Sequence, residues 1–141
     1  METTSKVHLS VRQADYTMEA SVEVIGQDLF IAVTGGDSPH IGTVTTLTRT
    51  TETETIRFPS HHGRFHKDDI LAKRIAMYIQ GDLPGSCVIT SGVHVDHISK
   101  MQIAVSSQMA ADLGQQILDW LKHTEFNTAD SIYYSKDEKP E

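Results

Sequence analysis

Apolar and polar side chains alternate strictly between residues 17 and 24, and this pattern constrains the fold more than any other feature of the chain. The apolar positions are Met18, Ala20, Val22 and Val24. Because successive side chains of a strand point to opposite faces, a period of two predicts a strand with one buried and one wet face. Gly26-Gln27 then predicts a tight turn into the apolar segment 29–33, which is expected to be a central strand of an antiparallel hairpin.

The rest of the chain predicts further strands and two helices. The strands are expected at residues 7–11, 42–49, 53–58 and 86–90. One helix is expected to begin near Asp68 and to end at Gly81. A second is expected from a capping box at Ser99 to about Lys122, with a break near Ser106 as an alternative. The apolar stripe of this second helix comprises Met101, Val105, Met109, Leu113, Ile117 and Leu121.

These elements predict an α+β fold, with a mixed, largely antiparallel sheet of about six strands and two main helices packed on it. With 141 residues, the chain is expected to form one domain at residues 1–126, followed by a polar, flexible tail at 127–141. Exposed helix stripes or edge strands in so small a chain favour a homodimer.

Charge and cysteine content disfavour several classes of protein. Lys and Arg number 12 and Asp and Glu 19, so the net charge is −7, whereas nucleic-acid binding usually needs a basic surplus. Cys87 is the single cysteine, so no disulfide can form within the chain. The longest wholly apolar run is far shorter than a membrane span, and residues 1–10 lack the apolar core of a signal peptide. We expect a cytoplasmic protein without a membrane segment.

Histidines concentrate in three loops, at residues 35–42, 61–69 and 92–99. Of the eight histidines in the chain, six lie there: His40, His61, His62, His66, His94 and His97. Each loop leaves a strand or enters a helix, so the three loops can converge at one end of the sheet. Binding sites are commonly built on such loops.

The first loop, Gly35-Gly36-Asp37-Ser38-Pro39-His40-Ile41-Gly42, is rich in turn formers. Its glycines let the backbone approach a ligand and expose N–H donors to an anion, and His40 can donate to a phosphate or a flavin carbonyl. The alternative is a tight connection between two strands, with Asp37 and Pro39 as turn formers. The residues alone leave both interpretations open.

The second loop places basic residues directly before a helix. Arg64 can hold a phosphate with two hydrogen bonds and Lys67 can add a point charge, while a helix N-terminus itself favours anions. We prefer this interpretation because positive charge is scarce elsewhere in the chain. In the alternative, Asp68 or Asp69 caps the helix and the basic cluster is a solvated loop.

The third loop contains Gly92-Val93-His94-Val95-Asp96-His97. On an extended segment His94 and Asp96 point to the same side, a pair suited to zinc, manganese or the polar groups of a ligand. Alternatively, Asp96 caps the last helix and His94 is a half-buried histidine. No HExxH or paired CxxC motif is present, which disfavours a dedicated zinc site.

Together these loops resemble one family, the small prenylated-flavin chaperones found with UbiD-type decarboxylases, formerly described as a component of bacterial gallate decarboxylase. The resemblance is carried by Gly35-Gly36-Asp37-x-Pro39-His40-Ile41-Gly42, by His66-Lys67-Asp68-Asp69 at the start of a helix, and by Gly92-Val93-His94-Val95-Asp96. The order and spacing of these motifs agree over residues 7–122.

The resemblance implies a fold like that of small proteasome-assembly chaperones, which are often dimeric. It also implies a non-enzymatic carrier that binds prenylated FMN (or FMN) and helps deliver it from the flavin prenyltransferase to an apo UbiD-type decarboxylase. The residues of the matching motifs that it places at the cofactor are Asp37, His40, Lys67, His94 and Asp96. We add Gly36, Gly42, Arg64, His66 and Asp68 as further candidate cofactor-binding residues. Arg64 and Lys67 are expected to take the phosphate, and His40 to contact the isoalloxazine edge or the phosphate. His94 and Asp96 are expected to bind polar groups of the ligand, directly or through a divalent metal ion.

Two other functions stay open at this point. One is a small metal-dependent hydrolase or decarboxylase that uses His94, Asp96 and His40. The other is an accessory protein that stabilises a decarboxylase complex without touching the cofactor.

Overall fold

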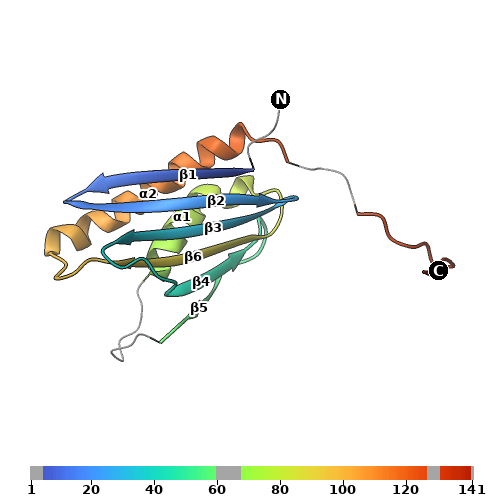
Figure 1. Cartoon of the computed structure of the whole chain (residues 1–141). Coiled ribbons are helices and arrows are strands. Elements are labelled where there is room, and N and C mark those ends of the chain that lie inside the picture. The colour runs from blue at the N-terminus through green and yellow to red at the C-terminus, as the bar shows by residue number, and fades with distance from the viewer. Residues whose placement is uncertain (1–4, 60–67, 127–130, 141) are drawn as a thin grey trace.

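A six-stranded sheet with two main helices makes up most of the described residues, 5–59, 68–126 and 131–140, of this computed structural model. The strands are β1 (Lys6–Gln13), β2 (Tyr16–Ile25), β3 (Asp28–Gly36), β4 (Thr43–Leu47), β5 (Glu54–Arg57) and β6 (Cys87–His94). The helices are α1 (Asp69–Ile79), the short 3-10 helix η1 (Gln80–Asp82) and α2 (Lys100–Lys122). The sheet order is β1-β2-β3-β6-β4-β5, with β3 and β6 parallel and all other neighbours antiparallel. The predicted α+β class and mixed, largely antiparallel sheet are confirmed (Figure 1).

The meander β1–β3 follows from the alternation of apolar and polar residues. In β2, Met18, Ala20 and Val22 are buried, while the residues between them are half-buried or exposed. Gly26 takes a φ of 64° in the turn to β3, a conformation that glycine adopts without strain. β3 lies between β2 and β6, which confirms that the apolar segment 29–33 is a central strand.

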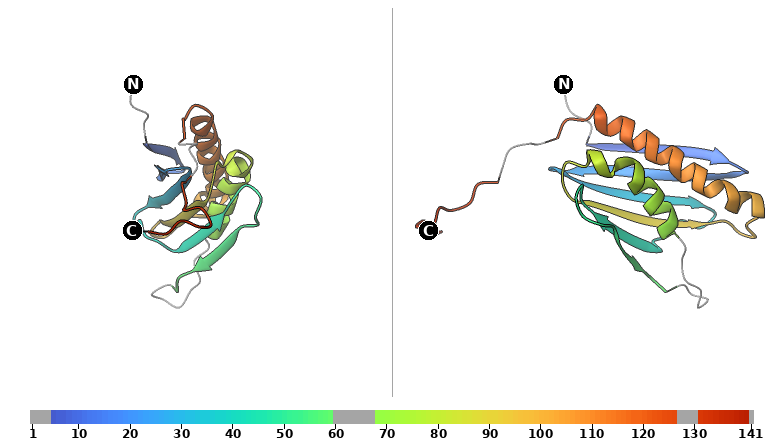
Figure 2. Two further views of the ribbon diagram at one scale, coloured as in Figure 1. Left: turned by 90° about the vertical axis from the view of Figure 1, so that its right-hand side faces the viewer. Right: turned by 180° about the vertical axis from the view of Figure 1, so that it is seen from behind.

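Both helices lie on one face of the sheet, so the molecule has two layers (Figure 2). α1 packs against β4, β6 and α2, and α2 also packs against β1 and β2. The core between the layers is apolar, and its fully buried side chains include Ile31, Ile75 and Met109. Burial of these side chains is the main force that holds the helices on the sheet.

Two local predictions differ from the structure. β6 continues through Gly92, in a stretch predicted to be a loop, because Gly36 of β3 pairs with His94 and prolongs the parallel ladder. α2 is continuous across Ser106, whose hydroxyl donates to a carbonyl one turn earlier in the same helix. The capping box at Ser99 is confirmed.

Within the described residues, none of the helices has the length and hydrophobicity needed to cross a bilayer. Residues 131–140 contain neither helix nor strand, and their side chains are exposed. The division into a domain at 1–126 and a tail at 127–141 stays a prediction.

Candidate functional site

The described loops meet at the end of the sheet where β3 and β6 finish and β4 begins. β3 and β6 run parallel and end together at the pair Gly36 and His94, so the segments that follow them start side by side (Figure 1). The start of α1 joins them, because Oδ1 of Asp68 accepts a hydrogen bond from the N–H of Val93 at 3.0 Å. Outside the described residues lie the predicted site residues Arg64, His66 and Lys67, together with His61 and His62.

The segment from Asp37 to Gly42 is held against β6 by hydrogen bonds. The N–H of Asp37 donates to the carbonyl oxygen of His94 at 2.6 Å, and the N–H of Gly42 donates to that of Ser91 at 2.8 Å. The Asp37 carboxylate accepts from the N–H of Asp96 at 2.8 Å. Asp37 therefore joins the two segments that follow β3 and β6, a longer-range task than that of a turn former.

Two glycines make this close approach possible. Gly36 has a φ of 76°, and a Cβ there would overlap the carbonyl oxygen of His94. A Cβ on Gly92 would overlap the carbonyl oxygen of His40. Contacts within the chain therefore explain why glycine is needed at both positions, because only a residue without a side chain lets the loop lie on β6.

His40 lies between this loop and the start of α1. Its Nδ1 is 2.9 Å from the carbonyl oxygen of Ser38, a contact that assigns the proton to Nδ1. Its Nε2 is 3.7 Å from Oδ2 of the buried Asp68. Asp68 occupies the N-cap position of α1, but its side chain makes no capping hydrogen bond. The alternative in which Asp68 caps the helix is therefore wrong.

His94 and Asp96 point to the same side, as predicted, and contact each other. Nε2 of His94 lies 3.0 Å from Oδ1 of Asp96, and both side chains are exposed. Ser99, not Asp96, caps α2. Among the residues that the structure describes, no group of three or more His, Cys, Asp or Glu side chains is placed to hold a metal ion. A metal ion at His94 and Asp96 stays a prediction.

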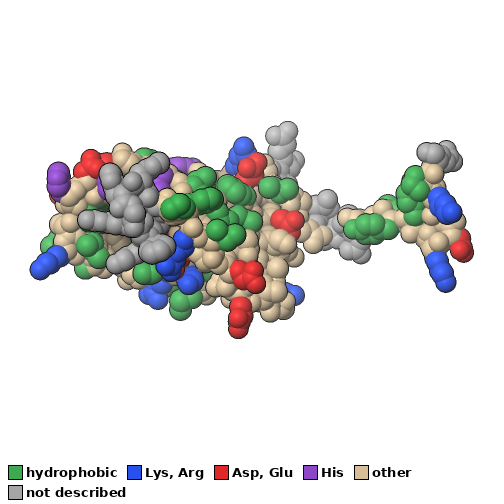
Figure 3. Space-filling model, turned by 90° about the horizontal axis from the view of Figure 1, so that it is seen from below, with side chains coloured by type: hydrophobic (Ala, Val, Ile, Leu, Met, Phe, Trp, Pro, Cys, Tyr) green, Lys and Arg blue, Asp and Glu red, His purple; other side chains and the backbone are tan. Residues whose placement is uncertain are grey.

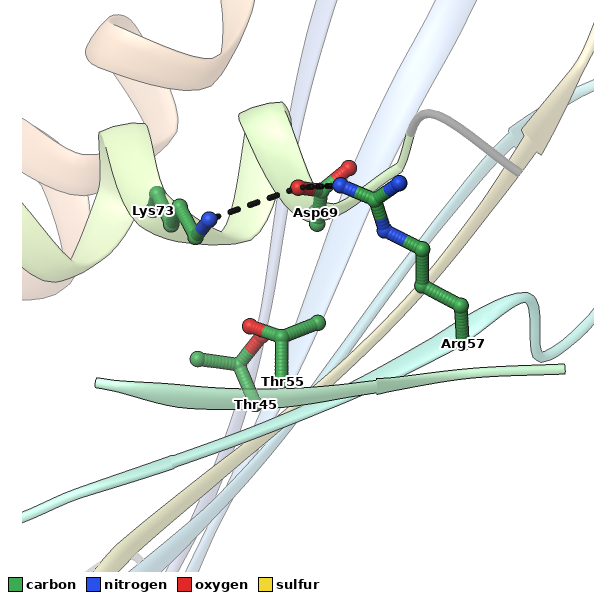
Figure 4. Close-up of polar contacts among 5 residues, drawn as sticks. All are labelled: Thr45, Thr55, Arg57, Asp69 and Lys73. Atoms are coloured by element: carbon green, nitrogen blue, oxygen red, sulfur yellow. Dashed lines mark hydrogen bonds and ion pairs between the residues drawn. The ribbon is translucent and has the colours of Figure 1, made fainter. Parts of the chain in front are cut away.

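A second polar cluster beside this site, formed by Arg57, Asp69 and Lys73, has only a partial signal in the sequence. Nη2 of Arg57 donates to Oδ2 of Asp69 at 2.7 Å, and Nζ of Lys73 lies 3.4 Å from the same oxygen (Figure 4). Burial raises the pKa of Asp69, but the hydrogen bond and charge of Arg57, and then those of Lys73, outweigh it and hold the pKa below its usual range. The i,i+4 spacing of Asp69 and Lys73 is detectable in a sequence, whereas nothing in the Thr-rich segment marks Arg57.

The Asp69→Asn protein is expected to be less stable than the wild type by about 1–2 kcal/mol at pH 7, because Arg57 and Lys73 lose the carboxylate between them. Since folding lowers the pKa of Asp69, its stabilisation is complete above the unfolded pKa of about 4 and is lost as pH falls through the folded value. Urea unfolding over a pH series should show that the stability difference between the wild type and Asp69→Asn shrinks below about pH 4. A difference that does not change with pH would contradict this assignment, and the exposed Asp82→Asn serves as the matched control.

Apolar side chains lie exposed beside this polar end of the sheet, namely Ile41, Ile56 and Phe58. The N–H of Phe58 donates to the carbonyl oxygen of Gly42 at 2.9 Å, which joins the end of β5 to the loop that carries His40. Figure 3 shows hydrophobic side chains gathered next to Lys and Arg side chains on the face seen from below. Apolar surface, cations and histidines in one region suit a ligand that has both a flat apolar part and a charged part.

Two grooves lie elsewhere on the described surface. One of about 480 Å³ lies on the sheet face that the helices leave uncovered, between Lys6, Ser21 and Phe30. The other, of about 270 Å³, lies at the opposite end of the sheet, around Asp28 and Thr50. Neither groove is lined by a residue that the sequence analysis assigned to the site.

A family model and one sequence relative identify the same kind of protein. The family described as "Prenylated flavin chaperone LpdD-like domain" matches residues 12–122. Protein LpdD of Lactiplantibacillus plantarum is 51% identical over 131 residues, which is 93% of this chain and 96% of that protein. A solved structure described as a novel chaperone complex for yeast 20S proteasome assembly matches with a TM-score of 0.47 and 12% identity, over 84% of this chain and 94% of that chain.

Proposed function

Because this chain belongs to the prenylated flavin chaperone LpdD-like family, we propose that it binds prenylated FMN and delivers it to the apo form of a UbiD-type decarboxylase. The protein is a chaperone rather than an enzyme. The chemistry that prenylated FMN supplies belongs to the decarboxylase that receives it. The task of this chain is to bind the cofactor, to shield it and to release it.

The observation that supports the flavin site is the meeting of the loop after β3 with the end of β6. Asp37 is bonded to the main chain at His94 and Asp96, and His40 lies over Gly92. These residues come from motifs 50 or more positions apart, yet they share one end of the sheet. A rigid sheet that carries such loops is a common support for a binding site.

The side chains at this end fit the parts of a flavin mononucleotide. The exposed Ile41 and Phe58 offer apolar contact for a flat ring. His40 and the His94–Asp96 pair offer hydrogen-bond donors and acceptors for the ring edge and the ribityl hydroxyls. Arg64, His66 and Lys67 remain assigned to the cofactor on the sequence alone.

The proposed function also implies a supplier of the cofactor, an oligomeric state and a cellular compartment. A flavin prenyltransferase would supply the cofactor, a homodimer would be the working form, and the cytoplasm would be the compartment. A carrier must also let its cargo go. Moderate affinity follows, and micromolar binding corresponds to about −8 kcal/mol.

Anaerobic purification after co-expression with a flavin prenyltransferase tests the proposal. Native mass spectrometry and an absorbance spectrum should show about one prenylated FMN per protomer in the wild type. His40→Ala should lose most of the bound cofactor, because it removes the imidazole between the loop and α1. A wild-type protein that carries no flavin under these conditions would overturn the proposed function.

The matched control for this experiment is His8→Ala, which removes an exposed imidazole on β1 in the larger groove. It is expected to retain the flavin. Loss of flavin in His8→Ala together with full retention in His40→Ala would move the site to the groove on the uncovered face.

A further inference from the structure

Two cations share one carboxylate oxygen at the start of α1, so the cluster of Arg57, Asp69 and Lys73 carries an excess positive charge. Arg57 and Lys73 lie 2.7 and 3.4 Å from Oδ2 of Asp69. The Asp69 side chain is 5% exposed, whereas those of Arg57 and Lys73 are 46% and 50% exposed. Figure 4 shows one terminal nitrogen of Arg57 on Asp69 and the other directed away from it. The buried carboxylate thus orients two cations that keep donors open to solvent.

We propose that Arg57 and Lys73 form the phosphate subsite of the flavin site, an inference that rests on the function proposed above. The ligand group is a phosphate monoester, which carries close to two negative charges at neutral pH. A guanidinium matches its oxygens with two parallel hydrogen bonds, and an ammonium adds a point charge. Asp69 is the positioning residue of this subsite.

The sheet beneath the cluster is polar where the rest of the core is apolar. Arg57 is opposite Thr43 in the register of β5 and β4, and Thr43 is opposite Ser91 in that of β4 and β6. These three side chains therefore project side by side from the face that α1 covers. Thr43 and Ser91 are fully buried, and their hydroxyls have no hydrogen-bond partner among the described residues. Buried hydroxyls of this kind are usually satisfied by water or by a ligand.

The first turn of α1 adds donors at the same place. Asp68 directs its carboxylate to the N–H of Val93 and does not cap the helix. The first N–H groups of a helix have no partner within it, and they favour an anion when no side chain caps them. Arg57, Lys73 and these N–H groups all favour a negatively charged ligand group.

The subsite is continuous with the loop that carries His40. Phe58, the neighbour of Arg57, donates its N–H to the carbonyl oxygen of Gly42. In the sheet, Arg57 is level with Ser91 of β6, two strands away. His94 lies three residues further along β6 than Ser91. Standard spacings put the Cα atoms of Arg57 and His94 about 14 Å apart. Because His94 lies three residues beyond Ser91, its side chain leaves the other face of the sheet. An elongated ligand with its anion at Arg57 therefore reaches the ring-binding residues around the end of the strands, past His40.

Binding of FMN and riboflavin to the purified protein, followed by isothermal titration calorimetry, separates the phosphate from the rest of the flavin. The wild type is expected to bind FMN about tenfold or more tightly than riboflavin. Arg57→Gln should bring this ratio close to one while leaving riboflavin affinity unchanged, and Lys73→Gln should lower it in the same direction. The matched control is Arg49→Gln, an arginine near the opposite end of the sheet, which should keep the wild-type ratio.

Each other outcome overturns part of the inference. Equal losses of FMN and riboflavin affinity in Arg57→Gln would mean that Arg57 only holds α1 to β5. A wild-type ratio in both variants would place the phosphate elsewhere. A wild type that binds prenylated FMN on co-expression but does not prefer FMN to riboflavin would overturn the subsite alone, whereas a wild type that binds no flavin in either experiment would overturn the proposed function as well.

Discussion

Replacing Gly92 with alanine is expected to destabilise the folded protein by about 3 kcal/mol and to abolish flavin binding. The new Cβ would overlap the carbonyl oxygen and carbon of His40, which are backbone atoms that cannot rotate away. Overpacking of this kind usually costs about 1–3 kcal/mol. Here the loop is also bonded to β6 at His94 and Ser91, so relief of the overlap must break those hydrogen bonds and move His40. Urea unfolding and retention of flavin after co-expression measure the two effects.

The matched control is Gly81→Ala, in the short helix η1. Nothing lies within 4 Å of the Cβ that this change adds, and Gly81 is not among the residues of positive φ. The substitution is expected to change the free energy of unfolding by less than about 1 kcal/mol, in the stabilising direction, because alanine restricts the unfolded chain. Equal stability of the Gly92→Ala and Gly81→Ala proteins would contradict the packing of the loop on β6.

Met109→Ala is expected to lower the free energy of unfolding by about 3–4 kcal/mol, within the range for a large side chain removed from a packed core. Met109 has 0% exposure and lies on α2 among side chains from both layers. Because neighbouring side chains close such a cavity only in part, the loss exceeds the transfer free energy of the missing atoms. Thermal and chemical unfolding of the purified variant measure it.

Met101 provides a control of the same residue type on the same helix, eight positions earlier. Its side chain is 69% exposed, so Met101→Ala is expected to change stability by less than about 0.5 kcal/mol. A large loss in Met101→Ala would show that this turn of α2 is covered in solution. If that loss grew with protein concentration, the cover would be a second copy of the chain.

The contrast between Met101 and Met109 shows what periodicity can predict. The apolar stripe identifies the buried face of α2 correctly from Met109 to Leu121. It gives no sign that Met101, in the first turn, is exposed in the described part of the chain, because the pattern reports side-chain type and not the extent of the sheet beneath. For β2 and β3 the pattern of apolar residues is sufficient to identify the buried face, since alternate side chains of both strands are buried beneath the helices.

Long-range pairing explains why β6 extends to His94, beyond the strand predicted at residues 86–90. A glycine followed by Val93 and His94 has the local composition of a loop, and only the ladder with Gly35 and Gly36 of β3 makes it a strand. At the site, sequence spacing predicted that His94 and Asp96 point to the same side, and in the structure the two side chains are in contact. Arg57 gave no signal, because its partner Asp69 lies on another element and the contact depends on how α1 packs on β4, the strand beside β5.

The parallel pair β3 and β6 also has a consequence for synthesis of the chain on the ribosome. The hydrogen bond from the N–H of Ser86 to Asp28 joins residues 58 positions apart, so the meander β1–β3 emerges well before the strand that completes the sheet. At about 5–20 residues per second, β3 waits about 3–12 s with one edge unpaired. An unpaired edge of an apolar central strand is a template for association with other chains. Slower synthesis prolongs that interval, and the yield of folded protein is expected to depend on how soon β6 closes the edge of β3.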